Sequence, residues 1–405
     1  MTPVATVDDH ARLIERMLAP VIANLPSETV PLTSALGRVT TSQVNSDVDL
    51  PLFRNSQMDG FAVRAADIRN APIALEVTGD VPAGHASPTT LIPGTAIRIM
   101  TGAPMPTGAD AVVPVEDTEL VLGLDDALAG AIVTVGRSRV PGEFVRERGS
   151  DLKRGELLIE AGTRLAPRHL AALAAAGIGR INVRRRLRVA IVTTGAELVA
   201  DDEELSVGRI FDANRVALMS AIVDAGAEVS VAERSDDDPG AFERVLRAAV
   251  SVSDLVVTTG GISKGAFEVV REVLEPLGAS VGTVAMQPGG PQATAIVDGV
   301  PVVCFPGNPV STQVSFAVFL APILRDAAGL APSPIETRTL AVRLTSIEGK
   351  RQFLRAVVHS DGTVEQVAGA SSHLVAAMAK ANALIDIPAE IASLPAGADV
   401  RVWRL

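Results

Sequence analysis

The 405-residue sequence contains no tyrosine, one tryptophan and one cysteine. With so few aromatic rings, the surface offers little on which unpaired nucleic-acid bases could stack. Positive charge is not in excess either, because 36 Lys and Arg residues face 47 Asp and Glu residues and the formal net charge is -11. A negatively charged protein is disfavoured from binding phosphate backbones non-specifically. These shortages argue against a nucleic-acid partner.

The single cysteine, Cys304, has no partner for an internal disulfide and lies in the apolar run 302–305, which predicts a buried strand. The first twenty residues are interrupted by acidic and basic side chains, so they do not resemble a signal peptide. The most apolar late segment, 314–324, is about half as long as a membrane span requires. We therefore expect a cytoplasmic protein without a membrane partner.

The length predicts about three or four domains. Apolar residues recur at helical spacing over 7–24, whereas short β-branched runs separated by Pro and Gly occupy the stretch after residue 44. We expect an α/β multidomain protein with the following parts: a helical and linker domain at 1–43 plus 140–186, a β insert at 44–139, an α/β domain at 187–329, and a C-terminal β domain at 330–405. The arginine-rich stretch 180–188 is interpreted as a solvated linker.

Strand and helix patterns alternate regularly from 187 to 328, which predicts a parallel, doubly wound α/β domain. In such sheets ligands bind outside the carboxyl ends of the strands. Three predicted strands end in polar or glycine-rich turns, TTGAE at 193–197, TTGGISKG at 258–265 and PGNPVS at 306–311. All three turns are therefore expected at one rim of the sheet.

The double glycine Gly260–Gly261 would let the backbone approach a ligand closely, and Ser263 and Ser311 lie near predicted helix starts, where an anion is favoured. The alternative is that each turn is ordinary and each serine only caps a helix. Neither a Walker A pattern nor GxGxxG is present, so a P-loop or dinucleotide fold is not supported.

Four carboxylates, Glu197, Asp212, Asp237 and Glu268, also fall at candidate rim positions. Oxygen ligands of this kind suit Mg²⁺, which could neutralise a bound phosphate. The alternative is that Asp237 only precedes a helix starting near Pro239, and that Glu268 is a solvated helix residue.

Five segments together resemble the molybdopterin molybdenumtransferase family, which includes the E domain of gephyrin. These segments are SQMDGFA at 56–62, MTGAPMPTGADAVVPVED at 100–117, TTGAEL at 193–198, TTGGISKG at 258–265 and FPGNPVS at 305–311. Their order and spacing match across nearly the whole chain. The resemblance implies four domains, among them a molybdopterin-binding doubly wound α/β domain and a small C-terminal β-barrel.

The resemblance also implies an activity, the Mg²⁺-dependent insertion of molybdate into adenylylated molybdopterin with release of AMP. It further implies an elongated homodimer whose active site joins the α/β domain of one subunit to the β insert of the other. Because the dithiolene sulfurs belong to the substrate, the reaction needs no catalytic Cys or His from the protein. Molybdopterin adenylyltransferase is a further candidate partner.

Motif matching assigns the family's functional positions to residues of this chain. The implied catalytic residues are Asp59, Thr101, Asp151, Glu197, Asp237 and Glu268, with Glu197 and Glu268 as metal ligands. The implied substrate-binding residues are Gly260, Gly261, Ser263, Pro306, Asn308, Pro309, Ser311, Arg355 and Ser372.

Some positions depart from the family pattern. Ala196 stands where an acidic residue is usual, and Glu268 stands where Asp is usual. The family's K-P-G-K-P signature reads QPGGP here, so Gln287 and Gly290 replace both lysines that would hold an oxyanion.

Charge-assisted hydrogen bonds contribute about 1.5 to 3 kcal/mol each, so the absence of both lysines should weaken oxyanion binding. Two hypotheses follow. Either Arg355, Lys264 or Lys350 substitutes for the lysines, or the chain is a weakly active or non-catalytic paralog that acts as a molybdopterin-binding scaffold. A third hypothesis, adenylyltransferase chemistry on the same α/β fold, is disfavoured by the β insert and the terminal β domain.

Overall fold

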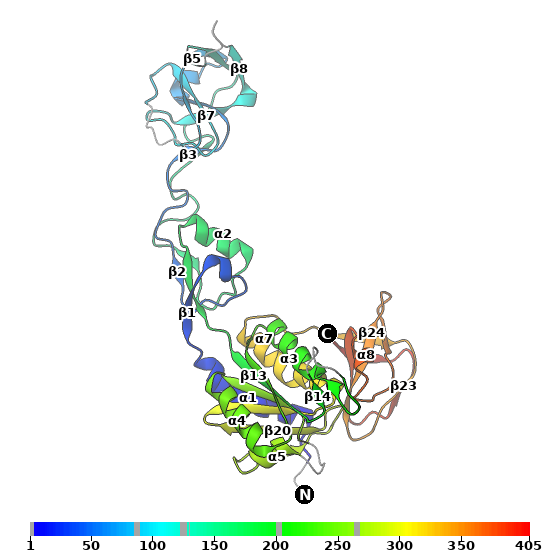
Figure 1. The fold of residues 1–405 in the computed structure, drawn as a ribbon. Coiled ribbons are helices and arrows are strands. Elements are labelled where there is room, and N and C mark those ends of the chain that lie inside the picture. Colours follow the sequence, from blue (N-terminus) through cyan, green and yellow to red (C-terminus); the bar gives the residue numbers. More distant parts are fainter. Residues whose placement is uncertain (1–3, 85–89, 122–127, 129, 200–204, 263–267) are drawn as a thin grey trace. The chain divides into compact units, whose positions relative to one another are not determined.

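The computed structural model describes residues 4–84, 90–121, 128, 130–199, 205–262 and 268–405 (Figure 1). The chain divides into two compact units. Unit 1 comprises residues 1–28, 37–39 and 183–405, and unit 2 comprises residues 29–36 and 40–182. Among the described residues, no helix is long and apolar enough to cross a membrane.

A six-stranded sheet in the order β16-β13-β17-β21-β20-β18 forms the centre of unit 1. Its strands are β13 (Arg188–Thr194), β16 (Glu228–Ser235), β17 (Leu255–Thr259), β18 (Ser280–Thr283), β20 (Pro291–Val297) and β21 (Val300–Phe305). The first four in spatial order are parallel, as a doubly wound fold requires. The predicted α/β domain is therefore confirmed.

The last two strands of this sheet differ from the fully parallel expectation. β20 runs antiparallel to β21, and β18 runs antiparallel to β20. The cause lies in the two-residue turn between β20 and β21, where Asp298 and Gly299 both have positive φ, 50° and 84°. Two positive φ values in a two-residue turn close a tight antiparallel hairpin.

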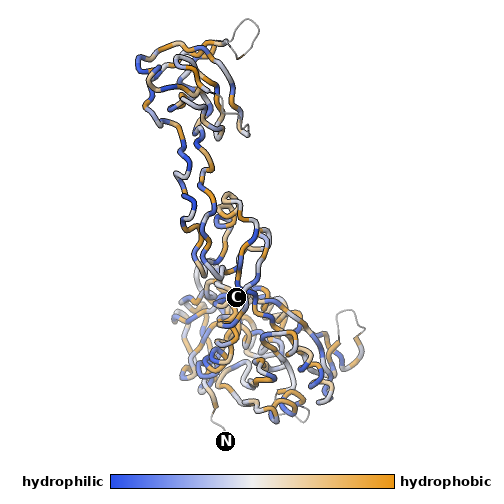
Figure 2. The backbone as a smooth tube through the Cα atoms, turned by 90° about the vertical axis from the view of Figure 1, so that its left-hand side faces the viewer, coloured by the Kyte–Doolittle hydropathy of each residue, from blue (hydrophilic) through white to orange (hydrophobic). Residues whose placement is uncertain are grey.

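Helices cover both faces of this sheet. One apolar cluster joins the sheet to α1 (Val7–Ala23), α3 (Ala213–Asp224), α6 (Pro309–Ser315), the π-helix η4 (Phe316–Leu320) and α7 (Ala321–Ala327). A second cluster joins the other face to α4 (Pro239–Ser251) and α5 (Val269–Leu274). Figure 2 shows hydrophobic segments running through this unit. The layered core leaves the strand ends free to carry a site.

The buried residues of two elements explain their placement. Phe242, Leu246 and Val250 recur every four residues on α4, so they form one buried stripe against the sheet. Asp238 caps the helix by accepting a hydrogen bond from the Gly240 N–H at 3.2 Å. On β21, Cys304 is fully buried, and this burial raises the pKa of its thiol to about 12. The prediction that Cys304 lies in a buried strand is therefore confirmed.

The C-terminal part of unit 1 contains a closed five-stranded barrel, as expected. Its strands are β22 (Ile335–Leu340), β24 (Arg351–Val358), β25 (Thr363–Gln366), β26 (Ala383–Ile387) and β28 (Asp399–Arg404). β26 pairs back with β24, so the sheet has no free edge within the ring. The short strand β19 (Met286–Gln287) pairs with the start of β24 and links the QPGGP stretch to the barrel.

Unit 2 contains the predicted β insert. Its six-stranded sheet has the order β7-β4-β6-β5-β9-β8. The strands are β4 (Gly60–Val63), β5 (Ile73–Val81), β6 (Thr95–Ile99), β7 (Ala111–Pro114), β8 (Thr118–Val121) and β9 (Ile132–Val135). The helix α2 (Pro167–Ala175) also lies in this unit, with Pro167 in its first turn.

Short elements complete the described chain. The remaining short strands are β1 (Ser27–Pro31), β2 (Val44–Asn45), β3 (Asn55–Ser56), β10 (Val145–Arg146), β11 (Leu157–Ile159), β12 (Arg180–Arg184), β14 (Leu198–Val199), β15 (Ile210–Phe211), β23 (Leu344–Thr345) and β27 (Ser393–Leu394). The remaining helical turns are η1 (Leu32–Ser34), η2 (Ala65–Ile68), η3 (Val115–Asp117) and α8 (Val375–Met378).

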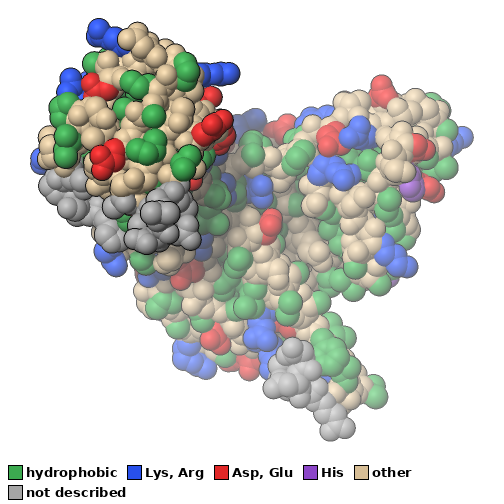
Figure 3. Space-filling model, turned by 90° about the horizontal axis from the view of Figure 1, so that it is seen from above, with side chains coloured by type: hydrophobic (Ala, Val, Ile, Leu, Met, Phe, Trp, Pro, Cys, Tyr) green, Lys and Arg blue, Asp and Glu red, His purple; other side chains and the backbone are tan. Residues whose placement is uncertain are grey.

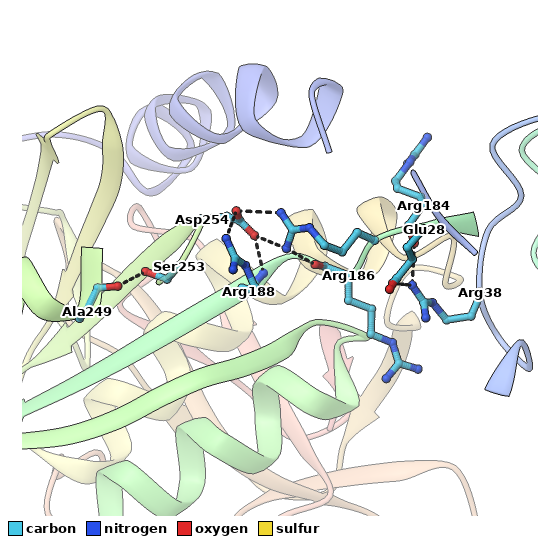
Figure 4. Close-up of polar contacts among 9 residues, drawn as sticks. Glu28, Arg38, Arg184, Arg186, Arg188, Ala249, Ser253 and Asp254 are labelled. Carbon is cyan, nitrogen blue, oxygen red and sulfur yellow. Dashed lines mark hydrogen bonds and ion pairs between the residues drawn. The ribbon is translucent and has the colours of Figure 1, made fainter. Parts of the chain in front are cut away.

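The arginine-rich stretch is more than a solvated linker, which corrects that interpretation. Arg185 donates two hydrogen bonds of 2.9 Å to the Asp254 carboxylate. Arg188 lies 3.5 Å from the same carboxylate (Figure 4). Arg38 pairs with Glu28 and also donates to the Arg184 carbonyl. These pairs fix the backbone just before β13. On the face drawn in Figure 3, acidic and basic side chains are interspersed.

Candidate active site

A cavity of about 870 Å³ lies at the carboxyl ends of the parallel strands in unit 1. The three turns that follow β13, β17 and β21 all line it, together with the QPGGP stretch and residues from the barrel. Its lining residues include Gly195, Glu197, Asp212, Asn214, Asp237, Gly260, Gly261, Glu268, Gln287, Gly290, Pro306, Gly307, Asn308, Pro309, Ser311, Lys350, Ser371 and Ser372. The turns predicted to share one rim are therefore brought together.

Two glycines allow these turns to interlock. Gly260 has φ of +96°, and a Cβ atom there would lie 2.5 Å from the Thr194 carbonyl oxygen. A Cβ atom on Gly307 would lie 3.2 Å from the Cα of Gly260. The backbone of each turn thus packs directly against the next, which only residues without side chains permit.

Three buried side chains form hydrogen bonds to the backbone carbonyls of the turn at 306–308. Asn214, at the start of α3, donates from Nδ2 to the Gly307 carbonyl at 2.7 Å and to Thr259 Oγ1 at 3.1 Å. Thr259 and Thr312 both donate to the Pro306 carbonyl, at 3.0 and 2.6 Å. Sequence reasoning missed this set. Thr259 lay inside a noted motif, but nothing in the sequence places Asn214 beside it.

The four predicted carboxylates line the cavity and differ in their partners. Asp212 is engaged with the protein, because its oxygens accept hydrogen bonds from Thr193 Oγ1 at 2.6 Å and from the Arg215 N–H at 3.0 Å. Asp237 accepts from the Ala196 N–H at 3.1 Å, next to Glu197. Because the helix cap of α4 is Asp238, Asp237 is not the capping residue.

Glu197 and Glu268 are the two predicted metal ligands. A Cβ atom on Gly195 would lie 2.7 Å from a carboxylate oxygen of Glu197, so this side chain folds back over its own turn into the cavity. Glu268 lies at the start of α5. Within the described ranges, no group of three or more His, Cys, Asp and Glu side chains could hold a metal ion.

The candidate cations differ sharply in position. Lys350 lines the cavity, and among its described lining residues no other is Lys or Arg. Arg355 does not line it. The Arg355 side chain is buried and donates to the carbonyls of Gly369 and, at 2.9 Å, Ser371, so it shapes the loop that carries Ser372. The Ser372 carbonyl in turn accepts from the Val310 N–H at 3.0 Å. Ser263 and Lys264 lie outside the described residues.

The two positions where the family has lysine both line the cavity. The side-chain oxygen of Gln287 accepts a hydrogen bond from Gln352 on the barrel strand β24. Gly289 has φ of +99°, but Gly290 is not among the described glycines with positive φ. A Cβ atom on Gly290 would meet no atom closer than 3.5 Å. Side chains are therefore sterically permitted at both positions.

The remaining predicted residues lie in unit 2. Asp59 Oδ1 accepts hydrogen bonds from the Thr101 N–H at 2.6 Å and from Thr101 Oγ1 at 2.8 Å. These bonds from Thr101 hold the pKa of the Asp59 carboxyl below its ordinary value of 3.8. The structure thus brings Asp59 and Thr101 together. Asp151 is exposed, and its N–H donates to the Leu50 carbonyl at 2.9 Å.

The glycine-rich cavity at the strand ends and the doubly wound sheet define an α/β ligand-binding protein. Residues 190–326 match the family described as "Probable molybdopterin binding domain". Residues 5–177 match "MoeA N-terminal region (domain I and II)", and residues 337–405 match "MoeA C-terminal region (domain IV)".

Similar proteins of known name cover the whole chain. It is 41% identical to molybdopterin molybdenumtransferase 2 of Mycobacterium tuberculosis over 99% of both chains. It is 35% identical to a molybdopterin molybdenumtransferase of Nostoc, over 100% of this chain and 94% of that protein. The solved molybdopterin biosynthesis MoeA protein from Pyrococcus horikosii is 31% identical, with a TM-score of 0.78 over 99% of both chains. The chain belongs to the molybdopterin molybdenumtransferase family, and it is a transferase of molybdenum cofactor biosynthesis.

Proposed function

We propose that this chain inserts molybdate into adenylylated molybdopterin and releases AMP. The observation that carries the proposal is the cavity in which the turns after β13, β17 and β21 meet the carboxylates Glu197, Asp237 and Glu268. A ligand can approach the backbone of these turns closely. The neighbouring carboxylates are suited to hold a cation. The experiment is direct: purified protein, adenylylated molybdopterin, molybdate and Mg²⁺ are combined, and AMP and cofactor are measured. Pterin binding without AMP release would instead support the weakly active or scaffold alternative.

Magnesium fits this donor set. Glu197 and Glu268 supply carboxylate oxygens at the cavity, and a Mg²⁺ ion commonly takes one or two protein carboxylates, with water and substrate phosphate as its other ligands. When bound, the ion would neutralise phosphate oxygens and stabilise the departing phosphate group. The protein's part is to hold the two carboxylates at the rim and to position the substrate against the turns.

We expect Glu197→Gln and Glu268→Gln each to slow AMP release by at least about tenfold, equivalent to about 1.4 kcal/mol. A neutral amide keeps the shape of the side chain but removes the charge that holds the metal. Binding of the adenylylated pterin, measured by calorimetry, should change less than turnover. Glu272→Gln is the matched control, since Glu272 is exposed one turn further along α5 and does not line the cavity. Normal turnover of both variants at limiting Mg²⁺ would refute these roles.

Lys350 is our candidate for the molybdate-binding cation in place of the absent family lysines. It lines the same cavity as Ser311 and Ser372, whereas Arg355 is committed to backbone carbonyls. An ammonium group there would attract an oxyanion into a cavity whose other described charges are negative. Molybdopterin adenylyltransferase as a partner remains an expectation from the family resemblance. A cytoplasmic location remains an expectation from the cysteine usage.

We further propose a homodimer whose active site takes Asp59 and Thr101 from one subunit and the cavity from the other. Light scattering should give twice the mass of the chain. Mixing Asp59→Asn and Glu197→Gln chains should restore about a quarter of wild-type activity, because half of randomly mixed dimers then hold one intact site of two. A monomeric mass at micromolar concentration, or no recovery in an exchanging mixture, would contradict the shared site.

A further inference from the structure

We infer that Thr312, Asn214 and Thr259 are positioning residues that turn two peptide N–H groups of the 306–308 loop toward a bound oxyanion. The inference deepens the proposed function and rests on it. It assigns a task to three buried side chains, of which only Thr259 lies inside a motif noted in the sequence. Thr259 and Thr312 are at most 1% exposed, and Asn214 is 9% exposed.

The argument begins with the carbonyl groups. The Pro306 carbonyl accepts hydrogen bonds from both threonine hydroxyls, and the Gly307 carbonyl accepts from the Asn214 amide. In a trans peptide the N–H points opposite to the C=O. The N–H groups of Gly307 and Asn308 therefore point away from the groups that bind the two carbonyls, and both residues line the cavity.

Neither of these N–H groups donates to an acceptor within the described part of the chain. Two consecutive N–H groups that converge on one point form a small anion-binding concavity. The ligand class that fits is a tetrahedral oxyanion such as molybdate. Backbone donors of this kind can bind an oxyanion without a positive side chain.

The supporting side chains are suited to hold one orientation of the loop. Both hydrogens of the Asn214 amide are engaged, while its Oδ1 is buried without a partner in the described structure. A buried acceptor left unpaired costs about 1–3 kcal/mol, so packing alone would not favour asparagine at this position. The amide nitrogen of Asn214 is the atom that contacts the loop, through its hydrogen bond to the Gly307 carbonyl.

The test compares Thr312→Val with Thr312→Ser by calorimetric titration of the full-length protein with sodium molybdate. Valine keeps the volume of threonine but removes the hydroxyl, whereas serine keeps the hydroxyl. We expect Thr312→Val to weaken molybdate binding at least about fivefold and Thr312→Ser to stay within about twofold of wild type. Ser220→Ala, which removes an exposed hydroxyl that bonds only within α3, should leave binding unchanged.

A second measurement separates positioning from general damage. Hydrogen exchange at the Gly307 and Asn308 amides should slow on adding molybdate in wild type and Thr312→Ser, but not in Thr312→Val or Asn214→Asp. Equal molybdate affinity and equal protection in Thr312→Val and Thr312→Ser would overturn the inference while leaving the proposed function intact. Failure of wild type to bind molybdate would refute the proposed function and, with it, this inference.

Discussion

Replacing Gly260 by alanine is expected to destabilise the protein by about 3 kcal/mol and to abolish substrate binding in the cavity. Two costs add. A side chain at φ of +96° costs about 1–2 kcal/mol, and a clash in a packed region costs about 1–3 kcal/mol. The added Cβ would lie 2.5 Å from the Thr194 carbonyl oxygen and 2.6 Å from its hydroxyl. Because these atoms belong to the neighbouring turn, the two turns must separate.

Denaturant unfolding of Gly260→Ala measures the loss. Gly282→Ala is the matched control, because Gly282 lies in the same sheet and a Cβ there meets nothing within 4 Å. That variant should keep wild-type stability or gain slightly, since alanine restricts the unfolded chain more than glycine does. Should the two variants unfold at the same denaturant concentration, the close packing of the three turns would not be what fixes the cavity.

This glycine also shows what the sequence could predict. The double glycine after a predicted strand indicates a backbone that a ligand can approach closely, and the approach of a ligand stays a prediction. The sequence does not say what approaches. In the structure, Gly260 contacts the backbone of Thr194 and Gly307, so its first role is to let the turns pack together. The backbone segments that pack against Gly260 can be identified only when the order of the strands is known.

The order of the strands was predictable in part. Alternating strand and helix patterns identified the four parallel strands, because every crossover carried a recognisable helix. The hairpin between β20 and β21 was not predicted, although Asp298–Gly299 is a common hairpin turn pair. The alternation of strands and helices on either side of it favoured a fully parallel sheet. The two antiparallel strands matter for the site, because the QPGGP stretch leads directly into β20.

The cations show where sequence reasoning ends. Arg355, Lys264 and Lys350 were all candidates to replace the absent family lysines, and motif matching assigned only Arg355 to substrate binding. The register of β24 decides between the two that the structure describes. It places Arg355 inside the barrel wall opposite Leu384, whereas Lys350 precedes the strand and reaches the cavity. Side-chain direction in a barrel depends on strand pairing, which a local pattern does not specify.

Replacing Gln287 and Gly290 together by lysine is expected to strengthen molybdate binding by about 1–3 kcal/mol, a factor of roughly 5 to 150. Both positions line the cavity, where the described carboxylates outnumber the single cation Lys350. Two added ammonium groups would supply charge-assisted hydrogen bonds to the oxyanion. A side chain at position 290 is sterically feasible, because Gly290 lacks the positive φ of its neighbour Gly289 and has room for a side chain.

The two substitutions should not contribute equally. At position 287 the native side chain bonds to Gln352, whose own Oε1 is buried without a partner in the described structure. A new ammonium group there has a competing acceptor, so Gln287→Lys alone should gain less than Gly290→Lys. Calorimetry with sodium molybdate measures each variant, and thermal melting establishes that each is folded. The gain should shrink as salt is added, because exposed charges are screened.

Lys350→Ala completes the comparison. If Lys350 is the native molybdate ligand, this change should weaken binding in the parent, and the double lysine variant should recover it. Suppose instead that the folded double variant binds no better than the parent. Loss of binding in Lys350→Ala would then show that one cation and the backbone donors already suffice. Unchanged binding in both variants would mean that the oxyanion lies elsewhere, and the assignment of this rim to molybdate would be wrong.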